Sequence, residues 1–295
     1  MLTEQISPRY AGMGSWHTAE ILNAMYEGQL AAVAAVGPAL PRLAAAVEGT
    51  VPALQRGGRL IYVGAGTSGR IGVQDGVELT PTFDWPTGRT AFLLAGGPGA
   101  LLNSIEGAED NEAAGAMAVE ETGVGPHDVV IAVAASGKTP YTLGALRASR
   151  ERGALTIAIA NNTGAPLLSI AHHPIAVPTG GEVIAGSTRM KAGTAQKIVL
   201  NLFSTAVMVK LNRVYRGLMV HMRATNDKLR RRAEGIVHEI AGCGEAEAAR
   251  CLYQANGDVK TAILLGFGVQ MAEASALLAR HGDNLREAIA ELSRR

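Results

Sequence analysis

The sequence predicts an α/β fold: a doubly wound, five-stranded parallel sheet with helices before it and an all-helical region after it. Short, β-branched apolar runs alternate with helix-compatible stretches through the middle of the chain. Glycine, 36 of 295 residues, is concentrated at the ends of these runs. Continuous apolar runs are typical of strands covered on both faces, and their alternation with helices indicates a doubly wound domain.

Two helices are expected before the first strand, over residues 17–34 and 40–55. Gly37-Pro38 separates them and Gly57-Gly58 ends the second, because glycine and proline interrupt a helix. We expect residues 1–44 to form an N-terminal helical arm.

Five strands and their connecting helices make up a domain that we delimit at residues 45–210. The expected strands are 60–63, 91–94, 129–133 and 156–159, with 174–177 as a weaker fifth. Helices are expected over 110–121 and 139–152, and a long buried helix over 182–211. The remainder, 211–295, reads as entirely helical, with two helices on either side of a capping turn between 247 and 264.

The charge balance excludes general electrostatic binding to nucleic acid or to an anionic membrane, because 27 Lys and Arg face 26 Asp and Glu. The strongest apolar run, 198–209, contains Asn201, Ser204 and Thr205 and is too short to span a bilayer. The first residues lack the order of a secretory leader. We therefore expect a globular, cytoplasmic protein.

Metal chemistry is not indicated by the sequence. Cys243 and Cys251 are the only two cysteines, too few for a disulfide framework or for a structural zinc site. His172-His173 is the only histidine pair, and adjacent side chains point in different directions.

Two loops that follow strands carry hydroxyl and glycine residues together. The first contains Gly66, Thr67 and Ser68, and the second contains Ser136, Gly137, Lys138 and Thr139. In open parallel sheets, ligands bind beyond the carboxyl ends of the strands, where backbone amides at helix starts favour anions. The pattern predicts a binding site for a compact phosphate group. The simpler alternative is that each Ser or Thr only caps its helix.

A dinucleotide site is the other interpretation of the first loop, since Gly64, Gly66 and Gly69 have the G-x-G-x-x-G spacing. That site needs an acidic residue at the tip of the second strand to hold the ribose. Ala95-Gly96-Gly97 stands there instead, so the dinucleotide interpretation fits poorly.

The two loops resemble the phosphosugar-binding loops of the sugar isomerase (SIS) domain. Further segments resemble the N-acetylmuramic acid 6-phosphate etherase family, and the likeness covers nearly the whole chain. These segments are 106–110, 181–197, 224–229 and a helical segment near 240–270 that is similar to a UBA domain. The chain departs from the family pattern at Ser7-Pro8, at Glu27-Gly28 and at 79–82, which bears on substrate details and dimer contacts.

The resemblance implies an elimination on an amino-sugar phosphate. Opening of the sugar acidifies the C2 proton, its removal expels the D-lactyl oxygen from C3, and water then adds to the unsaturated aldehyde. The products are N-acetylglucosamine 6-phosphate and D-lactate. This route needs a base, an acid and a fixed phosphate, but neither a metal nor a redox cofactor.

Glu78 and Glu109 match the two catalytic carboxylates of the family, which implies that Glu78 protonates lactate and Glu109 removes the C2 proton. Val77 and Leu79 flank Glu78, so we expect partial burial to raise its pKa. Glu109-Asp110 could equally be ordinary charge near a helix start, and Glu106 shares its helical face. Lys191 lies in the 181–197 run without an assigned contact.

Two other functions remain open at this stage. A phosphosugar isomerase would abstract the same C2 proton and return it at C1. A phosphosugar sensor without catalysis would have no need of two carboxylates. The resemblance also implies a homodimer whose sites can borrow residues from the neighbouring subunit. Gly66, Thr67, Ser68, Ser136, Gly137 and Thr139 are the expected substrate-binding residues.

Overall fold

The computed structural model describes residues 2–222 and 226–294. Ala224 and Thr225, part of one segment that carried the resemblance, lie outside the described residues. By their contacts the residues form two compact units. The first is Met1–Val77 with Thr87–Val207, and the second is Glu78–Pro86 with Met208–Arg295.

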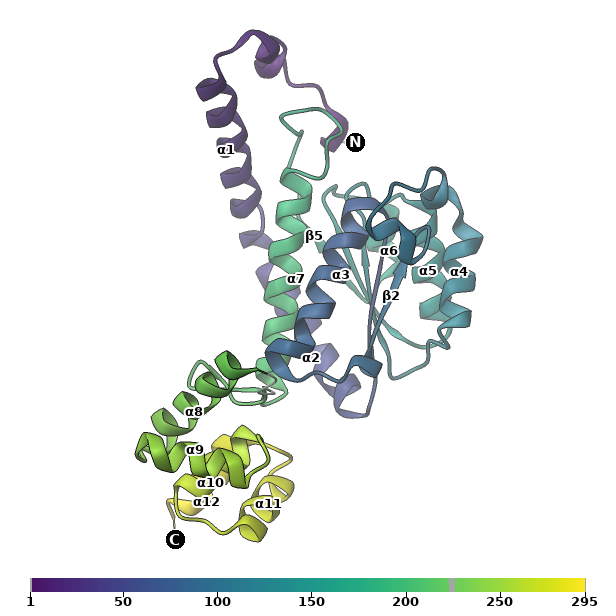
Figure 1. Cartoon of the computed structure of the whole chain (residues 1–295). Coiled ribbons are helices and arrows are strands. Elements are labelled where there is room, and N and C mark those ends of the chain that lie inside the picture. The colour runs from purple at the N-terminus through teal and green to yellow at the C-terminus, as the bar shows by residue number, and fades with distance from the viewer. Residues whose placement is uncertain (1, 223–225, 295) are drawn as a thin grey trace. The chain divides into compact units, whose positions relative to one another are not determined.

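The first unit contains the expected parallel sheet, in the order β2-β1-β3-β4-β5 (Figure 1). Its strands are β1 (Leu60–Gly64), β2 (Thr90–Leu94), β3 (Val129–Val133), β4 (Leu155–Ala160) and β5 (His173–Ala176). All four pairings are parallel, which confirms the predicted five-stranded α/β fold. The strand order reverses direction between β1 and β3, so the crevice between their carboxyl ends is the expected place for a ligand.

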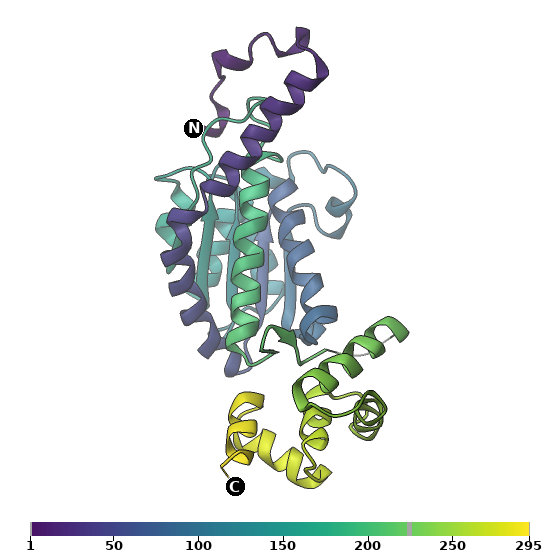
Figure 2. The same cartoon turned by 90° about the vertical axis from the view of Figure 1, so that its left-hand side faces the viewer.

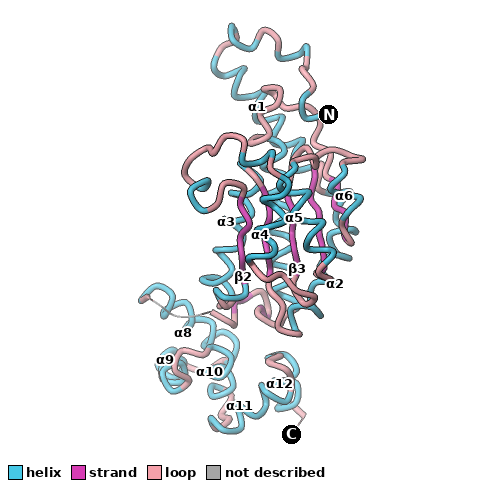
Figure 3. The backbone as a smooth tube through the Cα atoms, turned by 90° about the vertical axis from the view of Figure 1, so that its right-hand side faces the viewer, coloured by secondary structure: helices cyan, strands magenta, loops and turns pink. Residues whose placement is uncertain are grey.

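Helices cover both faces of the sheet. α4 (Glu112–Glu121), α5 (Pro140–Glu151) and α6 (Pro166–Ile170) lie over one face, which Figure 3 shows in front. α2 (Leu40–Gln55), α3 (Gly66–Phe83) and α7 (Lys191–Lys210) lie on the other side, which Figure 2 shows together with α1 (Thr18–Ala34). The central strands are therefore buried on both faces, which is why they are continuously apolar.

A buried polar cluster joins β1, α3 and α7. Asp75 is 5% exposed. It accepts hydrogen bonds from the Tyr62 hydroxyl at 2.9 Å, from Asn201 Nδ2 at 2.6 Å and from Ser204 Oγ at 3.1 Å. Burial raises the pKa of Asp75, although these donors act against the shift. Asn201 and Ser204, which interrupt the apolar run 198–209, thus have a structural reason for being there.

The long helix expected over 182–211 is shorter than predicted, because α7 begins only at Lys191. The residues before it form an irregular segment in which Gly186 has a φ of +76°. The fully buried Glu182 carboxylate accepts the backbone N–H groups of Lys191 and Ala192, both at 2.9 Å. This carboxylate caps the helix and marks its start.

By length and composition alone, the stretch Thr18–Gln55 could cross a membrane, since 18 consecutive residues within it have a mean hydropathy of 1.7. It is not one helix: a 3₁₀ turn at Gly37–Ala39 separates α1 from α2. α2 buries Leu43, Val47 and Leu54. The α2 part of the stretch therefore packs within the folded domain.

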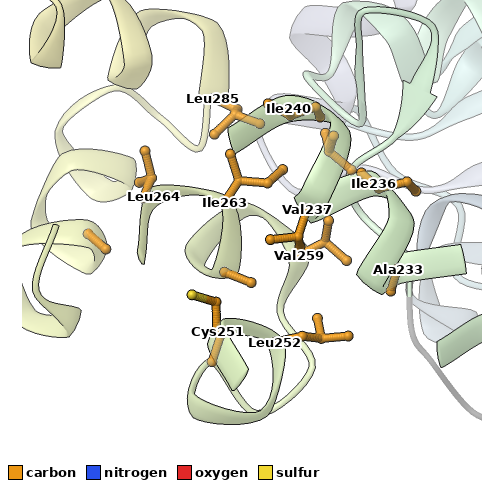
Figure 4. Close-up of a cluster of buried hydrophobic side chains, with 14 of the residues drawn as sticks. Ala233, Ile236, Val237, Ile240, Cys251, Leu252, Val259, Ile263, Leu264 and Leu285 are labelled. Atoms are coloured by element: carbon orange, nitrogen blue, oxygen red, sulfur yellow. The ribbon is translucent and has the colours of Figure 1, made fainter. Parts of the chain in front are cut away.

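The second unit contains α8 (Asp227–Ala241), α9 (Glu245–Gln254), α10 (Val259–Gly266), α11 (Met271–Arg280) and α12 (Leu285–Leu292). Figure 4 shows their common core, in which Val237, Leu252 and Ile263 meet. The helix pair predicted around a capping turn is confirmed as α9 and α10, with Asp258 accepting the N–H of Thr261. The prediction of an entirely helical region missed a short hairpin, β6 (Val214–Tyr215) with β7 (Leu218–Met219).

Candidate functional site

The first hydroxyl loop turns sharply from β1 into α3. A Cβ on Gly64 would lie 2.8 Å from the backbone nitrogen of Gly69, and one on Gly69 would lie 2.8 Å from the backbone oxygen of Gly64. Only glycine fits at these two positions. α3 begins at Gly66, so Thr67 and Ser68 lie in its first turn, where backbone N–H groups have no partner inside the helix. This loop can offer amides and hydroxyls to an anion.

The second hydroxyl loop leads from β3 into α5. Thr139 is the residue that precedes α5, and its side chain makes no capping hydrogen bond. The Ser136 hydroxyl accepts the backbone N–H of Lys138 at 3.1 Å. Gly137 has a φ of +62°, and a Cβ there would lie 2.4 Å from the Cβ of Ala165. The capping alternative therefore describes neither hydroxyl of this loop, because Lys138 lies before the first residue of α5.

Two pockets adjoin these loops, and we call them the β1-side pocket and the β3-side pocket. The β1-side pocket has a volume of about 390 Å³, and its lining includes Gly66, Arg70, Glu106 and Glu109. The β3-side pocket has a volume of about 350 Å³ and is lined by Gln5, Ser136, Lys138, Asn162, Thr163, Gly164 and Ala165. Both lie at the carboxyl ends of strands, but on either side of the crevice expected between β1 and β3. The β1-side pocket lies at the loops after β1 and β2, and the β3-side pocket lies at the loops after β3 and β4.

Glu109 lies in the 3₁₀ turn Ala108–Asp110 and is exposed within the chain. It lines the β1-side pocket together with Gly66, the first residue of α3. Glu106 lines the same pocket, so the ambiguity between these two carboxylates persists in three dimensions. Both therefore face the same cavity as the start of α3.

Glu78 is exposed, and its neighbour Val77 is 49% exposed, whereas Leu79 is buried. The partial burial that we expected around Glu78 is thus absent, because its helical position turns it away from the core that Leu79 enters. Glu78 is not among the residues that line either pocket. It lies on the fourth turn of α3, about 18 Å of helical rise beyond Gly66.

Three basic residues near the loops have different roles. Arg70 donates to the carbonyl oxygens of Ala100 at 3.0 Å and Asn103 at 2.9 Å, so it holds the loop after β2. Lys191 donates from Nζ to the carbonyl of Gly181 at 2.9 Å and so supports the start of α7. Lys138 is exposed and lines the β3-side pocket, where its charge can meet an anion.

Sequence reasoning missed two segments of the β3-side pocket. Asn162 and its neighbours follow β4, and two asparagines directly after a buried strand were a signal that could have been used. Gln5 gave no such signal, because its neighbours in the pocket lie more than a hundred residues away in sequence.

Histidines and other possible ligands do not gather into a metal site in the part of the chain that the structure describes. His172 Nδ1 lies 2.8 Å from the Thr156 hydroxyl, so this ring nitrogen has a hydrogen-bond partner within the fold. Burial lowers the pKa of both His172 and His173.

Comparisons with known proteins extend over the whole chain. The SIS domain family matches residues 112–206, and the N-terminal SIS domain of glucokinase regulatory protein matches residues 42–150. An N-acetylmuramic acid 6-phosphate etherase of Deinococcus radiodurans is 50% identical, covering 98% of this chain and 95% of the relative. One of Halalkalibacterium halodurans is 44% identical, covering 99% of each.

Solved structures share the fold. A protein of E. coli CFT073, solved as a ligand complex, is 18% identical with a TM-score of 0.51, covering 68% of this chain and 96% of that protein. A phosphoheptose isomerase of Francisella tularensis is 16% identical with a TM-score of 0.50, covering 66% and 100%. At these identities the likeness concerns the sheet and its helices alone.

Proposed function

The chain belongs to the family of N-acetylmuramic acid 6-phosphate etherases, and we propose on this ground that it cleaves the D-lactyl ether of that sugar phosphate. The products are N-acetylglucosamine 6-phosphate and D-lactate. The observation that carries the proposal beyond family membership is the β1-side pocket, in which an exposed carboxylate, Glu109, and the first residue of α3 line one cavity. A carboxylate in the wall of a cavity beside one of the two hydroxyl loops is a geometry that C2 deprotonation can use.

In this mechanism Glu109 takes the C2 proton of the opened sugar, and the electron pair of that bond expels the C3 oxygen as a double bond forms between C2 and C3. Glu78 donates a proton to the departing lactate oxygen. Water then adds at C3 and restores the saturated aldehyde. Thr67, Ser68, Ser136 and Thr139 hold the substrate through hydroxyls and helix-start amides, with Gly66 and Gly137 giving the backbone room.

The experiment that tests the function incubates the protein with N-acetylmuramic acid 6-phosphate and measures D-lactate. Release of lactate, with solvent deuterium at C2 of the product, is the expected result. Return of an isomerised sugar without lactate would instead favour the isomerase, and binding without turnover would favour a sensor.

Glu109→Gln tests the base. We expect lactate release to fall by about 10²- to 10⁴-fold, because an amide cannot accept the C2 proton. Glu106→Gln is the matched control, since both residues line the β1-side pocket three positions apart. If the control loses activity and Glu109→Gln keeps it, the roles of the two carboxylates are exchanged.

We propose further that the protein is a homodimer and that Glu78 of the partner subunit is the acid that protonates the departing lactate oxygen. The support is that Glu78 lines neither pocket of its own chain and lies about 18 Å along α3 from Gly66. Inactive Glu78→Gln and Glu109→Gln proteins are unfolded together, refolded and assayed. Sites built across two chains restore about one quarter of wild-type activity, since half of the dimers are mixed and each has one intact site. Sites built within one chain restore none.

The exposed apolar side chains of α1 support the homodimer. We also propose that the protein acts in the cytoplasm, where its phosphorylated sugar substrate would be found. Its partner molecules in this proposal are the amino-sugar phosphate and a second copy of the chain.

A further inference from the structure

The N-terminal segment, residues 3–5, forms one wall of the β3-side pocket. Gln5 lines this pocket together with Ser136, Lys138 and Asn162. These residues come from the loops after β3 and β4, so the wall is built from parts of the chain that are far apart in sequence. Figure 1 shows the N-terminus beside the loop that precedes α7, near the carboxyl ends of the strands.

Thr3 fixes the segment in place. Its side chain is fully buried, and its hydroxyl accepts a hydrogen bond from Asn162 Nδ2 at 3.2 Å. Asn162 is itself 5% exposed, and its amide also donates to the carbonyl of Ala135 at 2.9 Å. The carbonyl of Thr3 accepts the backbone N–H of Gly186 at 3.3 Å. Chain termini are usually poorly ordered unless they are tied down, and here Asn162 and Gly186 hold the segment from two different loops.

The chemistry of the β3-side pocket suits an anion. Lys138 supplies a positive charge, Gln5 supplies an amide, and Ser136 and Thr163 supply hydroxyls. The side-chain N–H groups of Asn162 are already used by Thr3 and Ala135, so Asn162 only positions the wall. None of the described residues that line it carries a carboxylate. Such a set of donors around one cation matches a phosphoryl group, whose oxygens accept several hydrogen bonds at once.

We infer that residues 3–5 are part of the substrate site: Gln5 donates to the phosphoryl group of the bound sugar, and Thr3 is the positioning residue that holds Gln5 there. This inference rests on the proposed function for the identity of the sugar. The pocket itself requires only a phosphorylated ligand.

Gln5→Ala tests the direct contact. Calorimetry with N-acetylglucosamine 6-phosphate is expected to show binding about tenfold weaker, because a hydrogen bond to a charged group is lost. KM for N-acetylmuramic acid 6-phosphate should rise by a similar factor with kcat unchanged, since the contact is the same in ground and transition states. Gln55→Ala, at an exposed position on the last turn of α2, is the matched control. Unchanged binding and KM in Gln5→Ala would overturn the contact.

Thr3→Val tests the positioning role, because valine keeps the shape of threonine and removes the acceptor of Asn162. We expect faster amide hydrogen exchange over residues 2–6 and the same weakening of N-acetylglucosamine 6-phosphate binding. Thr3→Ser, which restores the hydroxyl, should recover both. Wild-type binding and exchange in Thr3→Val would overturn the role.

The outcomes separate this inference from the proposed function. If the wild-type protein releases no lactate but Gln5→Ala still weakens binding of the sugar phosphate and of inorganic phosphate, the etherase proposal fails and the N-terminal wall stands. If lactate is released and Gln5→Ala behaves as wild type, only the N-terminal wall is rejected.

Discussion

Asp128 is a well-satisfied carboxylate at the amino-terminal edge of the sheet. It is 6% exposed. It accepts from Arg59 through the backbone N–H at 2.9 Å, through Nε at 3.1 Å and through Nη2 at 2.7 Å, and from the Gly125 N–H at 2.9 Å. Burial acts against the charged form, but these donors outweigh it and hold the pKa of Asp128 below its usual value.

Asp128→Asn should lower the free energy of unfolding at pH 7 by about 1–3 kcal/mol, because the amide turns a donor toward Arg59. The folded pKa lies below the unfolded value of about 3.9, so the carboxylate stabilises the fold above that pH and loses this effect as the pH falls through the folded pKa. Urea unfolding from pH 7 to pH 3 should show the two proteins converging toward acid. Asp110→Asn, at an exposed position, is the control and should stay near wild type throughout.

Gly28 has a local reason for being glycine. A Cβ there would lie 3.1 Å from Val183 and 3.6 Å from the Lys191 side chain. Gly28 thus lets α1 approach the segment that carries Glu182. Glu27 is exposed and pairs with Arg9, a contact that contributes little to stability at the surface.

Among the elements, α3 fits tightly against the sheet. A Cβ on Gly76 would lie 2.5 Å from Phe92 and 2.9 Å from Tyr62, and these two rings are stacked at 5.8 Å. Rigid rings cannot give way as a flexible side chain can. The glycine is therefore required for the helix to lie as close to the strands as it does.

Gly76→Ala should destabilise the protein by about 1–3 kcal/mol through overpacking, even though alanine favours helices. Gly235→Ala in α8 is the matched control, since nothing lies within 4 Å of its Cβ and the position is exposed. That change should stabilise α8 by up to about 1 kcal/mol. Thermal unfolding of the two variants compares them, and a stable Gly76→Ala protein would show that α3 can move away from the sheet.

The strands and most helices could be predicted because each is set by its own sequence. The runs at 60–63 and 129–133 are apolar throughout since both faces of the sheet are covered. The start of α7 could not be found in this way, because Glu182 ends the irregular segment through bonds to residues nine and ten positions later. The hairpin at 214–219 is too short for any periodicity to reveal it.

The candidate site was predictable only in its outline. Loops that follow strands meet at one edge of a parallel sheet, so the sequence places the loops of Thr67 and Ser136 at the same edge. Ser136 lines a pocket there, whereas Thr67 is not among the residues that line either pocket. The Thr3–Asn162 bond depends on how the finished chain folds back on itself, and no local pattern encodes it. The exposure of Glu78 was also missed, because apolar neighbours on a helix point to different sides.

At the scale of the whole molecule, one apolar surface is left uncovered by the described residues. α1 exposes a stripe of four large side chains at helical spacing. They are Leu22 (59% exposed), Tyr26 (62%), Leu30 (51%) and Val33 (51%). Contiguous exposed apolar surface of this kind marks an interface with a protein or a membrane. The symmetric homodimer proposed above supplies a second copy of the same stripe as cover.

Leu22→Glu combined with Leu30→Glu places two carboxylates in that stripe. The double substitution should separate the subunits, because a two-fold interface contains each substituted residue twice. Sedimentation should give twice the chain mass of 30.6 kDa for the wild type and the single mass for the variant. Tyr253→Glu in α9, at a position 85% exposed, is the control and should remain a dimer. A wild-type protein that sediments as one chain but floats with lipid vesicles would assign the α1 stripe to a membrane instead. A variant that stays dimeric would assign the interface to another face.

If the acid is Glu78 of the partner subunit, the monomeric variant must also lose lactate release while still binding N-acetylglucosamine 6-phosphate, because only the proton donor leaves with the second subunit.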